Sequence, residues 1–165
     1  LDKAIGLIWE RQSGSYLLDA TIEVTRGFKK RDALRPVIVA IATDGPDLSS
    51  RHFSQVLAPL RDTGTTFHVI TLGPPSADIV SDDARNRDMV VEEGPRMSGG
   101  VHERLAAGSA LPGRLKQLGD VLTHQYLITY GHPDSLVPPD YIMVGARRTD
   151  LTARGTVVKD PQARR

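Results

Sequence analysis

The most informative segment of the chain is Pro36-Val37-Ile38-Val39-Ala40-Ile41-Ala42, which continues directly into Thr43-Asp44-Gly45. Its first seven residues are apolar at every position, without an alternation of apolar and polar side chains. Such a run is typical of a strand that is covered on both faces, as in a parallel sheet. The Asp-Gly pair and the proline after it predict a sharp turn at the carboxyl end of this strand.

The residues after this strand predict a βαβ unit. We expect Ser49 or Ser50 to cap a helix that Gly64 ends, with Pro59 as a kink inside it. The apolar stripe of this helix consists of Phe53, Val56, Leu57 and Leu60. A second strand follows over residues 66–72. Two strands joined through a helix are expected to lie parallel, with a right-handed crossover.

The rest of the chain predicts further helices and strands around this unit. Helical spacing indicates helices over residues 1–10, from Tyr16 to the basic run at 29–31 with Ser15 as N-cap, and after Ser109 with Leu111, Leu115, Leu118 and Leu122 as its stripe. Residues 81–88 could be a solvated loop or the start of a helix through Met97. Strands are expected over 101–105 and 125–130, and an antiparallel pair over 141–147 and 154–158 with a turn at Thr149-Asp150.

Together these elements predict an α/β fold with a doubly wound, mainly parallel, Rossmann-like sheet and a C-terminal antiparallel β pair. Residues 1–158 form one domain in this interpretation, and residues 159–165 form a polar tail. The chain of 165 residues is long enough for one ordinary core.

Composition excludes several classes of function. The net charge of +1 gives no electrostatic reason to expect a nucleic-acid or anionic-membrane partner. No apolar run is long enough to predict insertion into a membrane. The absence of cysteine excludes disulfides, thiolate nucleophiles and cysteine-based metal sites. The common phosphate-loop, dinucleotide and nucleophile-elbow motifs are also missing, so no catalytic residue is predicted.

Asp44 and Ser15 are the two candidate metal ligands. Ligands of open α/β sheets sit beyond the carboxyl ends of the strands, where Asp44 follows the most apolar strand. A carboxylate there suits Mg²⁺ or Mn²⁺, and the hydroxyl of Ser15, at a helix start near the same sheet edge, could add a second oxygen. The alternatives are that Asp44 only stabilises the turn and that Ser15 is only a helix cap. Two side chains do not make a tight site, because such an ion prefers about six oxygens.

Three segments in order resemble the latter part of a von Willebrand factor type A domain. They are Ser15-Tyr16-Leu17-Leu18-Asp19-Ala20, Val37-Ile38-Val39-Ala40-Ile41-Ala42-Thr43-Asp44-Gly45 and Phe67-His68-Val69-Ile70-Thr71-Leu72-Gly73. Ser98-Gly99-Gly100, the leucine-striped helix, residues 125–130 and the final β pair resemble the von Willebrand factor A-related domains of Acidobacteria and similar bacteria. The resemblance extends over residues 1–158, and its specificity comes from the order and spacing of short motifs.

The resemblance implies a doubly wound sheet with a metal-ion-dependent adhesion site built from three loops. In that family the first loop reads Asp-x-Ser-x-Ser, the second supplies a threonine and the third an aspartate. Ser15 stands at the position of the second-loop threonine, and Asp44 matches the third-loop aspartate within Thr-Asp-Gly. The first loop has no counterpart here, and we expect it upstream of Leu1 in an N-terminally truncated domain. Binding of Mg²⁺ or Mn²⁺ is therefore expected to be weak or absent.

The same resemblance places the missing first strand beside residues 36–42. Without it, that strand becomes an edge with unpaired backbone groups, so we expect self-association and poor solubility.

The leading hypothesis for function is a protein-binding module, for adhesion or scaffolding, whose secreted or periplasmic location the resemblance implies. A first alternative is a structural domain without metal binding. A second is a Rossmann-like, metal-dependent enzyme that uses Asp44, which would need a second acid or a histidine on a neighbouring loop. Asp47 is the nearest such acid in the sequence.

Overall fold

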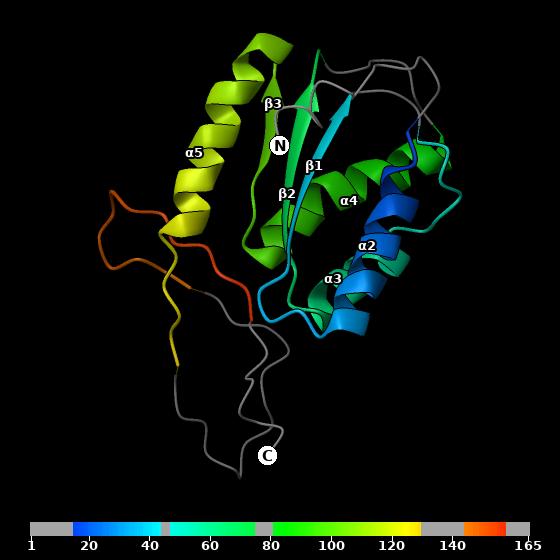
Figure 1. Ribbon diagram of the computed structural model, residues 1–165. Coiled ribbons are helices and arrows are strands. Elements are labelled where there is room, and N and C mark those ends of the chain that lie inside the picture. The colour runs from blue at the N-terminus through cyan, green and yellow to red at the C-terminus, as the bar shows by residue number, and fades with distance from the viewer. Residues whose placement is uncertain (1–14, 44–46, 75–80, 130–143, 158–165) are drawn as a thin grey trace.

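The described part of the chain is a three-stranded parallel sheet with helices on both faces (Figure 1). The computed structural model describes residues 15–43, 47–74, 81–129 and 144–157. The sheet order is β1-β2-β3, and the strands are β1 (Val37–Thr43), β2 (Thr66–Leu72) and β3 (His102–Leu105). This arrangement confirms the predicted α/β class and parallel sheet, and it is compatible with a Rossmann-like fold.

Strand β2 lies at the centre of the sheet and is buried from Thr66 to Thr71. It pairs with β1 in the register Val37↔Thr66 and with β3 in the register Val69↔His102. The chain passes very close to β2 at Gly100, where a Cβ atom would lie 1.8 Å from the carbonyl oxygen of Phe67. Glycine is therefore required where the chain enters β3.

Three helices cover one face of the sheet: α2 (Leu17–Arg31), α3 (Ser54–Asp62) and α4 (Asp82–Ser98). The core between them and β2 consists of Leu18, Ile22, Val56, Leu60, Phe67, Val69, Val90 and Val91. The structure decides the open alternative for residues 81–88 in favour of a helix. Ser81 caps α4 by accepting a hydrogen bond from Ala84 N (3.1 Å), and Gly99 ends it with a left-handed φ of 73°.

Two predicted serine caps are wrong. Helix α3 begins only at Ser54, with Phe53 at its N-cap and no capping side chain, so neither Ser49 nor Ser50 caps it. Helix α5 (Leu111–Thr123) follows the 3-10 turn η1 (Gly108–Ala110), and Ser109 lies inside that turn. A proline in the first turn of α5 lacks an N–H group, which removes one of the donors that a cap would satisfy.

Among the described residues, α5 is the one helix that covers the second face of the sheet, and Arg154 of the segment 144–157 also lies on this side. No residue of α5 is buried, and its leucine stripe is half-buried. On β1, Val39 and Ile41 remain 36% and 45% exposed. The prediction that this strand is covered on both faces is therefore wrong for the described residues. Three helices cover one face, but α5 leaves the side chains of Val39 and Ile41 on the other face partly exposed. Within the same residues β1 pairs with β2 alone, so its other edge is open.

The predicted C-terminal β elements do not form among the described residues. Residues 125–129 form no strand, and Tyr126, Leu127 and Ile128 are exposed. Residues 144–147 and 154–157 form no antiparallel pair, although the turn at Thr149-Asp150 is present. β-Branched and aromatic residues form strands only against a neighbouring strand, and none of the described residues provides one here. The predicted helix over 1–10, the turn at 44–46 and the tail over 159–165 lie outside the described residues.

Candidate functional site

Two segments far apart in sequence meet beyond the carboxyl end of β1. Ser15 and Asp47 form a parallel β-bridge, in which Leu48 N donates to the carbonyl oxygen of Ser15 at 2.7 Å. The hydroxyl of Ser15 also donates to Asp47 Oδ2 at 3.1 Å. The structure therefore brings Ser15 to the segment that follows Thr43. Asp44, the other predicted ligand, lies in that segment but outside the described residues.

Asp47 is the centre of this contact. The residue is 3% exposed, and its carboxylate accepts hydrogen bonds from Leu17 N to Oδ2 and from Ser49 N to Oδ1, both at 2.8 Å. Leu17 is the first residue of α2, so the carboxylate satisfies a backbone donor that the helix itself leaves unpaired. Its negative charge also lies at the positive end of the helix dipole.

The predicted N-cap role of Ser15 is wrong in detail. The N-cap residue of α2 is Tyr16, which makes no capping side-chain hydrogen bond. Asp47 and Ser49 provide the cap from about thirty residues away, because Asp19 N donates to the hydroxyl of Ser49 at 3.2 Å. An ion pair between Arg51 Nε and Asp19 Oδ1 (2.6 Å) adds a further link between the same two segments.

Ser15 keeps the chemistry that a metal ligand needs. Its hydroxyl hydrogen is directed to Asp47, which leaves the oxygen lone pairs available to a cation. The side chain is half-buried at the edge of the sheet. Asp47 is less suited to this role, because both of its oxygens already accept hydrogen bonds that hold α2 in place.

Arg87 also lies at the end of β1, and the sequence pattern did not predict it there. It is buried on α4, and its Nη2 donates to the carbonyl oxygen of Thr43, the last residue of β1, at 2.7 Å. Arg87 Nη1 also lies 3.5 Å from Asp88 Oδ1. The positive charge of a guanidinium at the end of β1 repels a metal cation at the same position and so weakens its binding. The sequence indicates the burial of Arg87 only through its spacing: it lies three residues from Ala84 and three from Val90, within the apolar stripe of α4.

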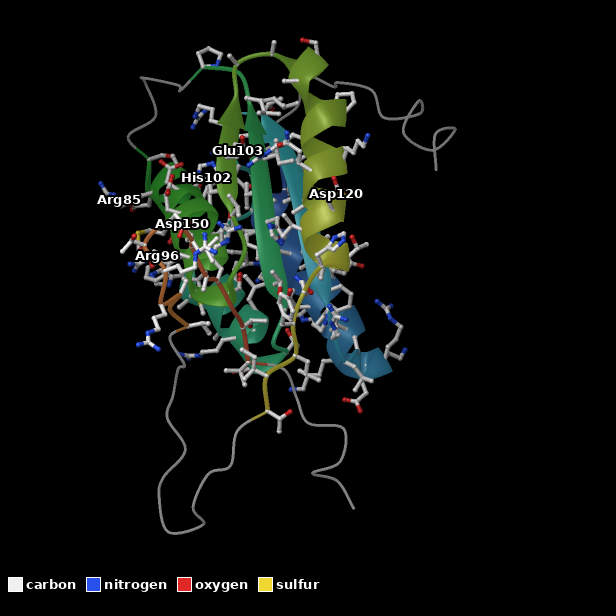
Figure 2. All side chains as sticks on the ribbon, turned by 90° about the vertical axis from the view of Figure 1, so that its left-hand side faces the viewer. Arg85, Arg96, His102, Glu103, Asp120 and Asp150 are labelled. Atoms are coloured by element: carbon white, nitrogen blue, oxygen red, sulfur yellow. The ribbon has the colours of Figure 1, made fainter. Side chains whose placement is uncertain are left out.

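A carboxylate, an imidazole and a hydroxyl are linked by hydrogen bonds on the α4 side of the sheet. His102, labelled in Figure 2, lies with Nδ1 3.0 Å from Glu92 Oε1 and Nε2 3.0 Å from the hydroxyl of Thr71. The same groups activate nucleophiles in hydrolases. Thr71, however, is 1% exposed, so a substrate cannot reach its hydroxyl. These hydrogen bonds connect α4 to the sheet as a structural element.

The described residues contain no group of three or more His, Asp or Glu side chains that could hold a metal ion. No helix among them is long and apolar enough to cross a membrane. Comparisons of the chain with family models, with curated proteins and with solved structures found no match. The geometry at the end of β1 is therefore the basis for the functional proposal.

Proposed function

We propose that this chain is a protein-binding module of the von Willebrand factor A type, with a weak site for Mg²⁺ or Mn²⁺ at the carboxyl end of β1. The observation that carries the proposal is the β-bridge between Ser15 and Asp47. The bridge joins Ser15, whose hydroxyl resembles the family's second-loop ligand, to Asp47, which follows Asp44 by three residues in the sequence. The parallel sheet with helices on both faces is the architecture that the proposal requires.

The residues at this edge fit a weak cation site. Ser15 supplies a neutral oxygen whose hydrogen points away to Asp47, and Asp44 supplies a carboxylate in the proposal. Water and a carboxylate of the protein ligand would complete the coordination of the ion. Arg87 lowers the affinity, because its charge lies at the carbonyl oxygen of Thr43. We therefore expect affinity in the millimolar range for the ion alone.

Calorimetric titration with MnCl₂ tests this proposal, with and without a short peptide that contains one aspartate. The peptide should strengthen binding of Mn²⁺, and an otherwise identical peptide with asparagine should not. Ser15→Ala and Asp44→Ala should each weaken binding, while Asp82→Ala, an exposed carboxylate on α4, should leave it unchanged. Sub-micromolar affinity that Asp44→Ala does not alter would refute the assigned role.

A structural domain without metal binding is the second candidate function. It is favoured by the full use of the Asp47 carboxylate in capping α2 and by the position of Arg87. In this alternative the polar groups beyond β1 serve only to join α2 to the sheet. An absence of heat and of any shift in melting temperature at tens of millimolar Mn²⁺ would favour it over the protein-binding site.

A further inference from the structure

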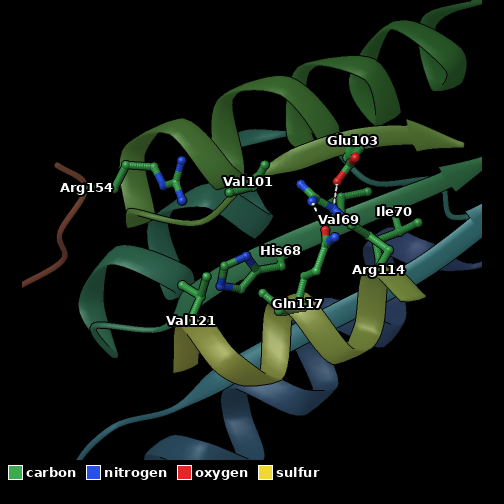
Figure 3. A pocket seen from close by; sticks show the side chains of 10 residues that line it. His68, Val69, Ile70, Val101, Glu103, Arg114, Gln117, Val121 and Arg154 are labelled. Carbon is green, nitrogen blue, oxygen red and sulfur yellow. Dashed lines mark hydrogen bonds and ion pairs between the residues drawn. The ribbon is translucent and has the colours of Figure 1, made fainter. Parts of the chain in front are cut away.

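A cavity lies on the other face of the sheet, between α5 and strands β2 and β3 (Figure 3). Its volume is about 70 Å³, enough for roughly five water molecules or for a small organic molecule. Most of the wall is apolar, and its apolar side chains are those of Ile70, Val101, Leu118 and Val121. This cavity is separate from the end of β1, where the residues of the proposed cation site lie.

His68 is the polar group in the wall of this cavity. It alternates with Phe67 and Val69 along β2, so its side chain points to the α5 side of the sheet, as Figure 3 shows. The residue is only 3% exposed, and neither ring nitrogen has a hydrogen-bond partner among the described residues. Buried polar atoms are nearly always hydrogen-bonded, so an unpartnered imidazole that faces a cavity calls for a partner inside it, which is either water or a polar ligand.

The charges around His68 define what kind of ligand fits. Glu103 on β3 and Arg114 on α5 form an ion pair with each other, and Arg114 Nη1 also donates to Gln117 Oε1 at 2.5 Å. Arg154, from the segment 144–157, lines the same cavity and makes no ion pair or hydrogen bond with another described residue. Among the described residues that line it, the cavity therefore has one positive charge without an ion-pair partner, that of Arg154, beside an imidazole. A metal cation is disfavoured there, and a single negative charge is favoured.

We propose that this cavity binds a small monocarboxylate, with its acid group between the ring of His68 and the guanidinium of Arg154. The carboxylate oxygens accept hydrogen bonds from both groups. A short aliphatic tail packs against Val101 and Val121, which a phosphate or sulfate could not match. An uncharged apolar molecule of the same size would leave both ring nitrogens without a partner. A ligand of about six non-hydrogen atoms, the size of butyrate, suits this volume.

The protonation of His68 gives this proposal a second observable. Burial, and then the charge of Arg154, lower the pKa of His68 from its ordinary value of 6.5, so the ring is neutral near pH 7. The other charged groups that face the cavity are Glu103 and Arg114, which neutralise each other. A bound carboxylate stabilises the protonated ring, so binding should raise the pKa of His68. Affinity should therefore increase as the pH falls towards the pKa of the unliganded ring, which lies below 6.5.

Titration of the full chain with sodium butyrate, followed by NMR of the histidine rings, tests the proposal. We expect saturable shifts of the His68 resonances with a dissociation constant on the order of 1 mM. Butyramide, which has the same shape without the charge, should produce no such shift. Arg154→Gln should weaken butyrate binding about fivefold, and Arg96→Gln, which removes an exposed arginine on α4, should not.

Val121→Trp provides a test that leaves His68 and the core unchanged. Val121 is half exposed at the edge of the cavity, so a tryptophan can enter the cavity without displacing buried side chains. This variant should abolish the butyrate-induced shifts while the protein keeps its fold. Linear, unsaturated shifts, an equal response to butyramide, or unchanged binding in Arg154→Gln and Val121→Trp would each overturn the proposal.

Discussion

Replacement of Asp47 by alanine tests the account of how α2 is attached to the sheet. The carboxylate is buried, and it accepts three hydrogen bonds, from the hydroxyl of Ser15 and from the backbone N–H groups of Leu17 and Ser49. The substitution removes all three acceptor contacts at once. It also removes the negative charge from the N-terminus of α2.

The expected loss of stability follows from these contacts. Loss of a helix cap costs about 1 kcal/mol and up to about 2. Besides the capped N–H group of Leu17, the N–H group of Ser49 and the hydroxyl of Ser15 lose their acceptor, which adds about 1 to 2 kcal/mol together. The free energy of unfolding should therefore fall by about 2 to 4 kcal/mol, which lowers the melting temperature by roughly 5 to 15 °C for a chain of this length. Asp47→Asn, which keeps one acceptor oxygen, should lose roughly half as much.

Urea unfolding, followed by circular dichroism, measures this change. Asp82→Ala is the matched control, because Asp82 is an exposed carboxylate in the first turn of α4 whose partner is Arg85. Its loss should change the free energy of unfolding by no more than about 0.5 kcal/mol. If Asp47→Ala and Asp82→Ala have equal effects, the carboxylate of Asp47 does not hold α2, and the reasoning is wrong.

Three further predictions concern the sheet and its two faces. Gly100→Ala should prevent stable folding, because its Cβ would lie 1.8 Å from the Phe67 carbonyl oxygen, while Gly119→Ala, in open space on α5, should stabilise the helix by about 0.5 to 1 kcal/mol in thermal unfolding. Because the pKa of His68 is lowered in the folded chain, the unfolded chain binds the imidazole proton at a higher pH than the folded chain does. The free energy of unfolding should therefore decrease as the pH falls below 6.5 towards the folded pKa. In urea titrations at several pH values, His68→Gln should remove that part of the pH dependence. Ile41→Lys should reduce self-association measured by light scattering, because it places a charge on the open edge strand β1. Val24→Lys on α2 should not reduce it. A wild-type chain that is already monomeric would contradict the prediction that the open edge of β1 causes self-association.

The central part of the fold could be predicted from the sequence because local patterns determine it. The apolar run that forms β1, the helix α3 and the strand β2 follow one another with clear turn residues between them. The covering of β1 could not be predicted in the same way. Its apolar composition is typical of a strand buried on both faces, but burial depends on which helices pack there, and α5 covers that face only loosely.

The candidate site shows the same division between local and distant effects. Ser15 was identified from its place at a helix start, and the structure confirms that it lies beside the segment after β1. The cap of α2 by Asp47 depends on a contact across thirty residues, which periodicity does not reveal. His68 lies in an ordinary strand pattern, and only the packing of α5 shows that its ring is buried without a partner.

Paramagnetic broadening by Mn²⁺ is the most direct test of the proposed cation site. In an NMR titration of the labelled chain, substoichiometric MnCl₂ should broaden the amide signals of residues 15–17 and 43–49 before any others, and Asp44→Ala should abolish this localised effect. Broadening that is uniform, that is centred on the exposed carboxylates of Asp82 and Asp83, or that persists in Asp44→Ala would contradict a cation site at the carboxyl end of β1.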